Sequence, residues 1–435
     1  MSSAVAQPPV RRGARGPEGF YGWHVTAYAA AVLVATAPGQ TVGVSTFVDP
    51  MIADLGVGRS AISAAYLVGT LTGALALPRL GRVIDRYGVR RCMFIIGAAF
   101  GTVLVMMSLI GGLAGLLLGF MGIRSLGQGA LGLTATIAAA RWFERRRGRA
   151  LGVVSAVGSA GISFVPVLVE IVISAQGWRT AWVVMGIAVW LIVLPAAAWG
   201  IRNDPSELGQ RPDGDRPTEG NRHVVRWGLT RRQAFAEPYF WVLTSGIAVS
   251  GLLATAVAFH QISLLGARGL SSTAAAANFI PQTVAGLIAT LFVGSLIDKV
   301  DVRYVVAVSM SLHAVALVWL TVVTPGWSAI GFGLAIGAAG ASIRITEAAA
   351  IPAYFGVMYL GSIRGVVAAV GVGSTAFGPL LFALGRDLTG SYQAVLLGSA
   401  VVPLLVAVAG FMFRPPTQAP GPAPAEGPTD AVGAD

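Results

Sequence analysis

The stretch GVVSAVGSAGISFVP, from Gly152 to Pro166, recurs as GVVAAVGVGSTAFGP from Gly365 to Pro379. The two copies share glycine, valine, phenylalanine and proline positions at an offset of 213 residues. The same offset aligns GRVID, which begins at Gly81, with GSLID, which begins at Gly294. Apolar sequence often matches by chance, but it does not keep Gly, Asp and Pro in one register over so long a span. The sequence therefore predicts two similar halves.

Apolar runs fill both halves of the chain. Hydrophobic residues make up 55% of the sequence and charged residues only 11%, and the mean hydropathy is +0.73. A water-exposed globule needs more surface charge, whereas each run can cross a hydrocarbon core of roughly 30 Å. We predict an all-α membrane protein with twelve transmembrane helices in two pseudo-symmetric six-helix bundles. The predicted helices cover residues 24–48, 60–80, 92–111, 113–139, 150–173, 179–201, 239–264, 273–297, 303–323, 327–352, 358–384 and 391–413.

Proline, glycine and charged residues collect between the sixth and seventh runs and after the last run. This composition favours disordered or loosely folded segments. The predicted division is a cytoplasmic N-terminal tail at 1–23, an N-terminal bundle at 24–201, a cytoplasmic linker at 202–238, a C-terminal bundle at 239–413 and a disordered cytoplasmic tail at 414–435.

The positive charge of the chain is concentrated in alternate loops. Lys and Arg number 30 against 19 Asp and Glu, which gives a net charge of +11. The basic loops contain Arg11, Arg12, Arg15, Arg82, Arg86, Arg90, Arg91, Arg141, Arg145, Arg146, Arg147, Arg149, Arg222, Arg226, Arg231 and Arg232. By the positive-inside rule this predicts a multi-pass protein of the cytoplasmic (inner) membrane with both termini in the cytoplasm. We therefore expect membrane lipid, and no nucleic acid, as a partner.

Residues that bind metals or catalyse reactions are sparse. Cys92 is the single cysteine, and the four histidines lie on different segments without metal-ligand spacing. There is no GxxxxGK[ST] motif, which disfavours an ATP-driven pump. We expect no metal, no cofactor and no enzymatic activity.

The loop after the second predicted helix carries a recognisable motif. GRVIDRYGVRR, from Gly81 to Arg91, resembles the loop signature of the major facilitator superfamily. A reduced copy begins at Gly294, and IRSLGQG from Ile123 resembles the arginine-bearing motif of the superfamily's fourth helix. The resemblance covers nearly the whole chain and implies the major facilitator fold.

The resemblance also implies a gate. Asp85 would latch to the eleventh helix and Asp298 to the fifth, and both contacts would break when the protein opens to the cytoplasm. Arg86 and Arg90 could pair with nearby acids or lipid phosphates. The alternative is a basic loop that only fixes the topology.

Further motifs resemble the monocarboxylate and oxalate–formate porter branch. They are FYGWHV at Phe20, PSELGQRPDG at Pro205, FHQISLL at Phe259 and YFGVMYLGSIRG at Tyr354. This resemblance implies a secondary transporter that moves a small organic solute, preferably a monocarboxylate, by alternating access with proton coupling or anion exchange. We expect it to be a monomer. The nearest alternative is an exporter of drugs or natural products in the same superfamily. A membrane enzyme or a sensor is a third alternative, but no motif supports either.

Charges inside predicted spans are costly and indicate functional sites. Arg124 lies within the fourth run, and Arg344 and Glu347 lie on one face of the tenth. At the repeat offset, Leu131 and Thr134 occupy the positions of Arg344 and Glu347, so this pair belongs to one half only. We expect Arg344, or failing that Arg124, to bind a carboxylate, with Glu347 as counter-ion or proton acceptor. The alternative is a permanent structural pair of Arg344 and Glu347.

Polar residues at membrane depth could complete a binding site. The candidates are Asn278, Gln282, Gln40, Thr41, Tyr66 and Gln128 as substrate ligands and His260 as a second proton acceptor. Interhelical hydrogen bonding is the alternative role for each of them. The monocarboxylate branch presents an arginine on the eighth helix where this chain has Gln282, so a weaker anion, a neutral molecule or a zwitterion stays open as the solute.

Overall fold

A computed structural model describes residues 19–214, 228–297, 299–356 and 358–416. These residues form helices and loops with no strand among them, which confirms the predicted all-α fold. The first half contains α1 (Gly22–Ala35), α2 (Thr41–Leu55), α3 (Arg59–Tyr87), α4 (Val89–Met107), α5 (Leu113–Ile123), α6 (Gly132–Ala140) and α7 (Arg147–Pro195). The second half contains α8 (Arg231–Ala236), α9 (Pro238–Gly266), α10 (Ser272–Ala277), α11 (Phe279–Leu296), α12 (Val302–Leu320), α13 (Trp327–Phe355), α14 (Leu360–Thr389) and α15 (Tyr392–Met412).

Ten helices in the described part of the chain are long and apolar enough to cross a membrane. The difference from twelve lies in two places. A 3-10 turn, Ala37–Gly39, divides the first predicted span into α1 and α2. The fifth and sixth spans run together in α7, which turns at Gly177 with a φ of 82°. Glycine adopts this left-handed conformation without a Cβ penalty, and the ten helices are consistent with the twelve predicted spans.

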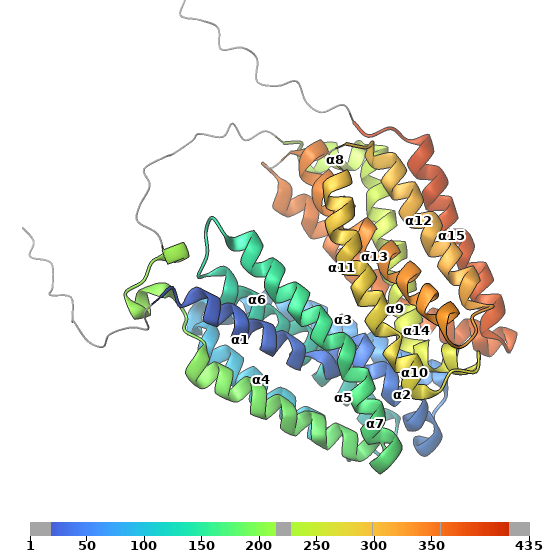
Figure 1. Ribbon diagram of the computed structural model, residues 1–435, viewed down its shortest axis with the longest axis horizontal. Helices are drawn as coiled ribbons and strands as arrows, with labels where there is room; N and C mark the ends of the chain where they lie inside the picture. The colour runs from blue at the N-terminus through green and yellow to red at the C-terminus, as the bar shows by residue number, and fades with distance from the viewer. Residues whose placement is uncertain (1–18, 215–227, 298, 357, 417–435) are drawn as a thin grey trace, which may run out of the picture.

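The helices form two bundles that follow the two halves of the chain (Figure 1). The bundles lie together at the end that carries α2 and α10, and they diverge toward the end that carries α6 and α8 (Figure 1). We call the diverging end the linker end. Across the interface, α2 contacts α9, α3 contacts α14, and α7 contacts α10 and α11. At the repeat offset, the second span corresponds to the eighth and the fifth span to the eleventh. The contact of α3 with α14 therefore has a counterpart in the contact of α11 with α7, so the interface itself is pseudo-symmetric.

The repeat is also visible in the packing inside each bundle. A Cβ at Gly73 would lie 3.3 Å from the backbone of Arg124, and a Cβ at Gly286 would lie 3.5 Å from the carbonyl oxygen of Gly337. At the offset of 213 residues, Gly73 corresponds to Gly286 and Arg124 to Gly337. Equivalent glycines therefore bring the second and fourth spans together in one half and the eighth and tenth in the other.

The first part of the linker is folded against the N-terminal bundle, whereas the composition suggested a loose segment. The carboxylate of Asp213 accepts hydrogen bonds from the backbone N–H groups of Glu144, Arg145 and Arg146 at 2.7–3.1 Å. Burial alone would raise the pKa of Asp213, but these donors outweigh it and lower that pKa. Asp213 therefore fastens the linker to the turn that immediately precedes α7.

Several sequence predictions concern residues outside the described ranges. They include most of the N-terminal tail (1–18), the middle of the linker (215–227), Asp298 and most of the C-terminal tail (417–435).

Gly337→Ala tests the close approach of α11 and α13. The new Cβ would lie 2.0 Å from the carbonyl oxygen of Gln282, which forces the two helices apart. We expect a loss of about 1–3 kcal/mol of stability, measured as a lower unfolding temperature of the purified protein in detergent. Gly373→Ala is the matched control, because a Cβ at that position meets nothing within 4 Å. Equal unfolding temperatures of the two variants would contradict the prediction.

Candidate functional site

Two irregular backbone segments meet inside the N-terminal bundle. The 3-10 turn Ala37–Gly39 interrupts the first span. In the fourth span, a π-helical segment, Arg124–Leu131, joins α5 to α6. A Cβ at Gly39 would lie 2.6 Å from the carbonyl oxygen of Ile123 and 3.0 Å from the Cα of Gly127. Only glycine permits this approach. π-helical segments of this kind occur often at functional sites.

Arg124 lies where these segments meet. Its side chain is only 3% exposed. Its Nε donates to the hydroxyl of Thr70 and its Nη1 to the carbonyl oxygen of Gly39, each at 2.9 Å. The guanidinium also lies 4.5 Å from the centroid of the Tyr66 ring. Within the described residues, no carboxylate pairs with it, so neutral groups and an aromatic face hold this buried cation.

Tyr66 connects Arg124 to the other bundle. Its hydroxyl lies 2.5 Å from Oγ1 of Thr41, and its ring centroid lies 4.7 Å from that of Phe259 in α9. Gln40 instead donates to Thr36 in its own span, and the Gln128 side chain is exposed. The structure therefore brings Thr41, Tyr66 and Arg124 together. Phe259, which the sequence offered only within a family motif, completes the contact.

Arg344 is an exposed cation on a long helix of the C-terminal bundle. It lies within α13, and its exposed side chain makes no ion pair with any described residue. A Cβ at Gly340 would lie 3.2 Å from Nη1 of Arg344 and 3.9 Å from the hydroxyl of Ser250 in α9. Gly340 thus leaves room for the guanidinium on the side of α13 that faces α9.

A histidine outside the predicted site supports this side of α13. His313 of α12 is fully buried; its Nδ1 lies 3.0 Å from the carbonyl oxygen of Ser309, and its Nε2 lies 3.0 Å from the hydroxyl of Ser250. A carbonyl can only accept, so Nδ1 carries the proton and Ser250 donates to Nε2. These two hydrogen bonds hold the Ser250 side chain in place on the side of α13 that carries Gly340 and Arg344.

Glu347 pairs with a neighbouring helix. One of its carboxylate oxygens lies 3.6 Å from Nη2 of Arg364 in α14. The permanent pair of Arg344 and Glu347, which the sequence left open, is therefore absent from the described contacts. Arg364 was missed as a site residue, although it belongs to the family motif at Tyr354.

The predicted amides of the eighth span form a network with α9 and α13. Nε2 of Gln282 donates to Gln261 at 2.7 Å and to Asn278 at 3.3 Å. Asn278 in turn donates to the carbonyl oxygen of Ala329 at 2.6 Å. Gln261 is fully buried and donates to the carbonyl oxygen of Ala275. In this state the amides bind other helices of their own bundle.

His260 lies at the closed end of the interface. Its Nε2 is 2.9 Å from the carbonyl oxygen of Pro379, and its Nδ1 is 3.4 Å from the hydroxyl of Tyr392. It therefore joins α9 to α14 and α15. Arg59, at the start of α3 in the N-terminal bundle, lies close enough to His260 to act on it electrostatically and pairs with Asp49 of α2.

The three predicted gating residues that the structure describes, Asp85, Arg86 and Arg90, contact their own bundle. Asp85, whose side chain is 75% exposed, pairs with Arg141 at 3.2 Å and not with α14. Arg90 donates to the carbonyl oxygens of Ala197 and Ala198 at the end of the sixth span. Arg86 lies over the neighbouring Tyr87 ring. An unlatched Asp85 agrees with bundles that diverge at the linker end.

Metal ligands do not gather anywhere in the described ranges. No group of three or more His, Cys, Asp or Glu residues there could hold a metal ion.

Two pseudo-symmetric bundles of helices long and apolar enough to cross a membrane define a multi-pass membrane protein. Residues 30–281 match the family profile of the Major Facilitator Superfamily, and the chain belongs to this superfamily of transporters.

The chain is also similar to curated proteins. The MFS-type transporter Rv1250 of Mycobacterium tuberculosis is 26% identical over 344 residues, which cover 67% of this chain and 58% of that protein. The MFS-type transporter YcxA of Bacillus subtilis is 25% identical over 169 residues, 37% of this chain and 39% of that protein. The match thus spans less than two thirds of the length of either relative.

Solved structures share the fold. A D-xylose–proton symporter superposes with a TM-score of 0.69 at 15% identity, over 91% of this chain and 98% of that one. A bacterial homologue of the human lysosomal transporter Spinster, in an inward-facing and unoccupied conformation, gives a TM-score of 0.68 at 15% identity, over 91% and 97% of the two chains. These comparisons establish the major facilitator architecture.

Arg124→Gln tests how Arg124 is held. The change removes the donors to the Thr70 hydroxyl and to the Gly39 carbonyl. Thr70 still donates to the carbonyl oxygen of Tyr66, but the buried Gly39 carbonyl loses its partner. An unsatisfied buried group costs about 1–3 kcal/mol, so we expect a lower unfolding temperature in detergent. Gln128→Ala, at an exposed position four residues on, should leave that temperature unchanged. If Arg124→Gln unfolds like the parent protein, Arg124 does not stabilise this bundle.

Proposed function

We propose that this protein is a secondary active transporter that moves a small organic anion, with a monocarboxylate as the preferred class, by alternating access. The observation that carries the proposal is Arg344, an exposed guanidinium at membrane depth without an ion-pair partner among the described residues. A charge is costly there unless it has a function. A bound carboxylate would supply the missing counter-charge through two parallel hydrogen bonds.

The partners of the other charges support Arg344 as the substrate cation. Arg124 already uses Nε and Nη1 within its bundle, and Arg364 is the partner of Glu347. Polar side chains of both bundles are proposed to complete the site: Thr41, Tyr66, Gln40 and Gln128 on one bundle, and Asn278 and Gln282 on the other. Tyr66 contacts both Arg124 and Phe259, so its contacts would change when one bundle moves against the other.

The direction of opening follows from the proposed topology. The arginine-rich loops and the linker lie at the diverging end, which the positive-inside rule assigns to the cytoplasm. The described state is then open to the cytoplasm. In the opposite state Asp85 would latch to α14, and Asp298 to the fifth span. We assign the chain to the cytoplasmic membrane as a monomer.

Glu347 is the proposed proton acceptor, with His260 as the second candidate. Glu347 lies one turn from Arg344, and its partner Arg364 is on a different helix, so the pair can separate when α13 and α14 move. Neutralising Glu347 would release Arg364 and change the charge beside the bound anion. Exchange of two anions at Arg344 is the alternative means of coupling.

Arg344→Gln tests the anion site in proteoliposomes that contain the purified protein. A charge-assisted hydrogen bond contributes about 1.5–3 kcal/mol, so its loss should raise the KM for labelled lactate, pyruvate, formate or oxalate about 10- to 100-fold. Arg344→Lys should retain part of the affinity, because lysine keeps the positive charge but lacks the two parallel N–H donors of the guanidinium.

Arg232→Gln is the matched control, since Arg232 is exposed on α8 at the linker end. It should transport like the parent protein. Saturable uptake that Arg344→Gln leaves intact would refute the anion role of Arg344. If the parent protein shows no carboxylate uptake at all, an exporter becomes the better assignment.

Glu347→Gln tests proton coupling by the same uptake measurement across pH. If Glu347 carries the coupled proton, the variant should lose the pH dependence of uptake and its response to an imposed pH gradient. Glu207→Gln, in the exposed part of the linker, should keep both. An unchanged pH profile in Glu347→Gln would exclude this residue as the proton carrier.

A further inference from the structure

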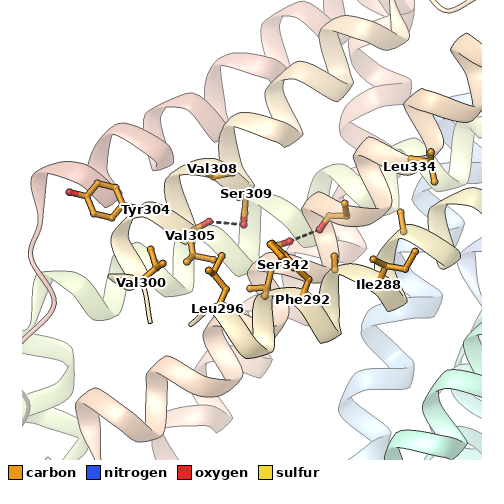
Figure 2. Close-up of a pocket in the computed structure, with 14 residues that line it drawn as sticks. Ile288, Phe292, Leu296, Val300, Tyr304, Val305, Val308, Ser309, Leu334 and Ser342 are labelled. Carbon is orange, nitrogen blue, oxygen red and sulfur yellow. Dashed lines mark hydrogen bonds between the residues drawn. The ribbon is translucent and has the colours of Figure 1, made fainter. Parts of the chain in front are cut away.

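A groove of about 490 Å³ lies between α11, α12 and α13 in the C-terminal bundle (Figure 2). Its α11 wall is a stripe at helical spacing: Ala285, Ile288, Ala289, Phe292, Val293 and Leu296. Val305, Val308 and Ser309 of α12 form the other wall, and Leu334, Ala338 and Ser342 of α13 form the floor. α11 and α12 each pack on α13. The small residues Ala338 and Ser342 give the groove its depth.

The groove presents a hydrocarbon surface. The Ser309 hydroxyl donates to the carbonyl oxygen of Val305 at 2.7 Å, and the Ser342 hydroxyl donates to that of Ala338 at 2.8 Å (Figure 2). Both polar groups are thus satisfied by their own helices. A polar solute would lose its hydration here without gaining a partner, so the groove fits an apolar occupant.

The groove also faces the bilayer. Ile288, Phe292 and Val308 on its rim are each more than 60% exposed. Arg344 is two residues beyond Ser342, which corresponds to a rotation of about 200° around the helix axis. Arg344 therefore lies on the opposite face of α13 from the groove. The occupant therefore reaches the groove from the membrane and not from the interface between the bundles.

The length and charge of the groove fit one lipid leaflet. From Ala285 to Leu296, at 1.5 Å per residue, the α11 wall is about 16 Å long, close to half of a hydrocarbon core of roughly 30 Å. Its linker end is formed by Val300 and Tyr304. Between them and α11 lies Lys299, the chain's single lysine, exposed and without an ion-pair partner among the described residues. An ammonium group at this depth attracts a lipid phosphate.

We propose that the groove binds one phospholipid of the linker-end leaflet, with an acyl chain along Ala285–Leu296 and its phosphate at Lys299. This site is separate from the solute site and does not depend on the proposed substrate. The bound chain fills the space between α11 and α12 over the floor of α13, and so holds the three helices together.

A photoreactive phosphatidylglycerol with a diazirine in its acyl chain tests the site in liposomes that contain the full-length protein. After irradiation, peptide mapping should find the label concentrated on α11 and α12 near Phe292 and Val308. The reference surface is α15, where Val401 and Leu405 are also exposed apolar residues. Labelling of α15 equal to that of the groove overturns the proposal and indicates ordinary contact with bulk lipid.

Variants separate the acyl chain from the headgroup. Ala338→Phe fills the floor and should remove most of the groove label while α15 keeps its own; Ala394→Phe, exposed on α15, is the matched control. Lys299→Ala should lower groove labelling by the phospholipid probe but not by a diacylglycerol probe, which lacks phosphate. Groove label that survives Ala338→Phe refutes the acyl site, and equal loss with both probes refutes the phosphate contact. If Ala338→Phe does not fold, the ratio of groove to α15 label in the parent protein still decides.

Discussion

Within the hydrocarbon region of a membrane, every backbone polar group must find its partner inside the protein, and a buried charge must be held by neighbouring polar groups. In this chain the requirement is met where the first span breaks. The 3-10 turn at Ala37–Gly39 leaves the Gly39 carbonyl outside a regular helix, and Arg124 donates to it. The π-helical segment that begins at Arg124 lies against the same glycine. Each irregularity is therefore tolerated because the other one contacts it.

The same requirement separates the features of the fold from those of function. Gly73 and Gly286 make equivalent contacts in the two halves, and the interface pairs of helices are related by the same repeat. These shared features hold the bundles and let them move against each other. Arg344, Glu347 and Arg364 have no such counterparts: at the offset of 213 residues they correspond to Leu131, Thr134 and Leu151. An asymmetric solute requires asymmetric ligands, and these charges provide them.

The sequence predicted the helices, their division into two bundles and the charges at membrane depth, because hydropathy and register are properties of the chain itself. It could not predict the partners of those charges. Arg124 binds a backbone carbonyl and a hydroxyl, and both depend on where the first span breaks. The spacing of Arg344 and Glu347 places them on one helical face, yet the carboxylate of Glu347 reaches Arg364, because α14 packs beside that face. His313 looked isolated in sequence, and only the packing of α12 against α9 brings it to Ser250.

The tenth span connects these observations. On one side of α13, Gly340 makes room for Arg344, and Glu347 faces α14. On the other side, Ala338 and Ser342 form the floor of a groove that is open to the bilayer. The two sides are separated by the width of one helix, so any tilt or rotation of α13 that adjusts Arg344 to a bound anion also changes the shape of the groove. A lipid that fits the groove in one state of the bundle better than in another would shift the balance between those states by that difference in binding free energy. The composition of the surrounding leaflet would then influence the anion site without any contact between lipid and solute.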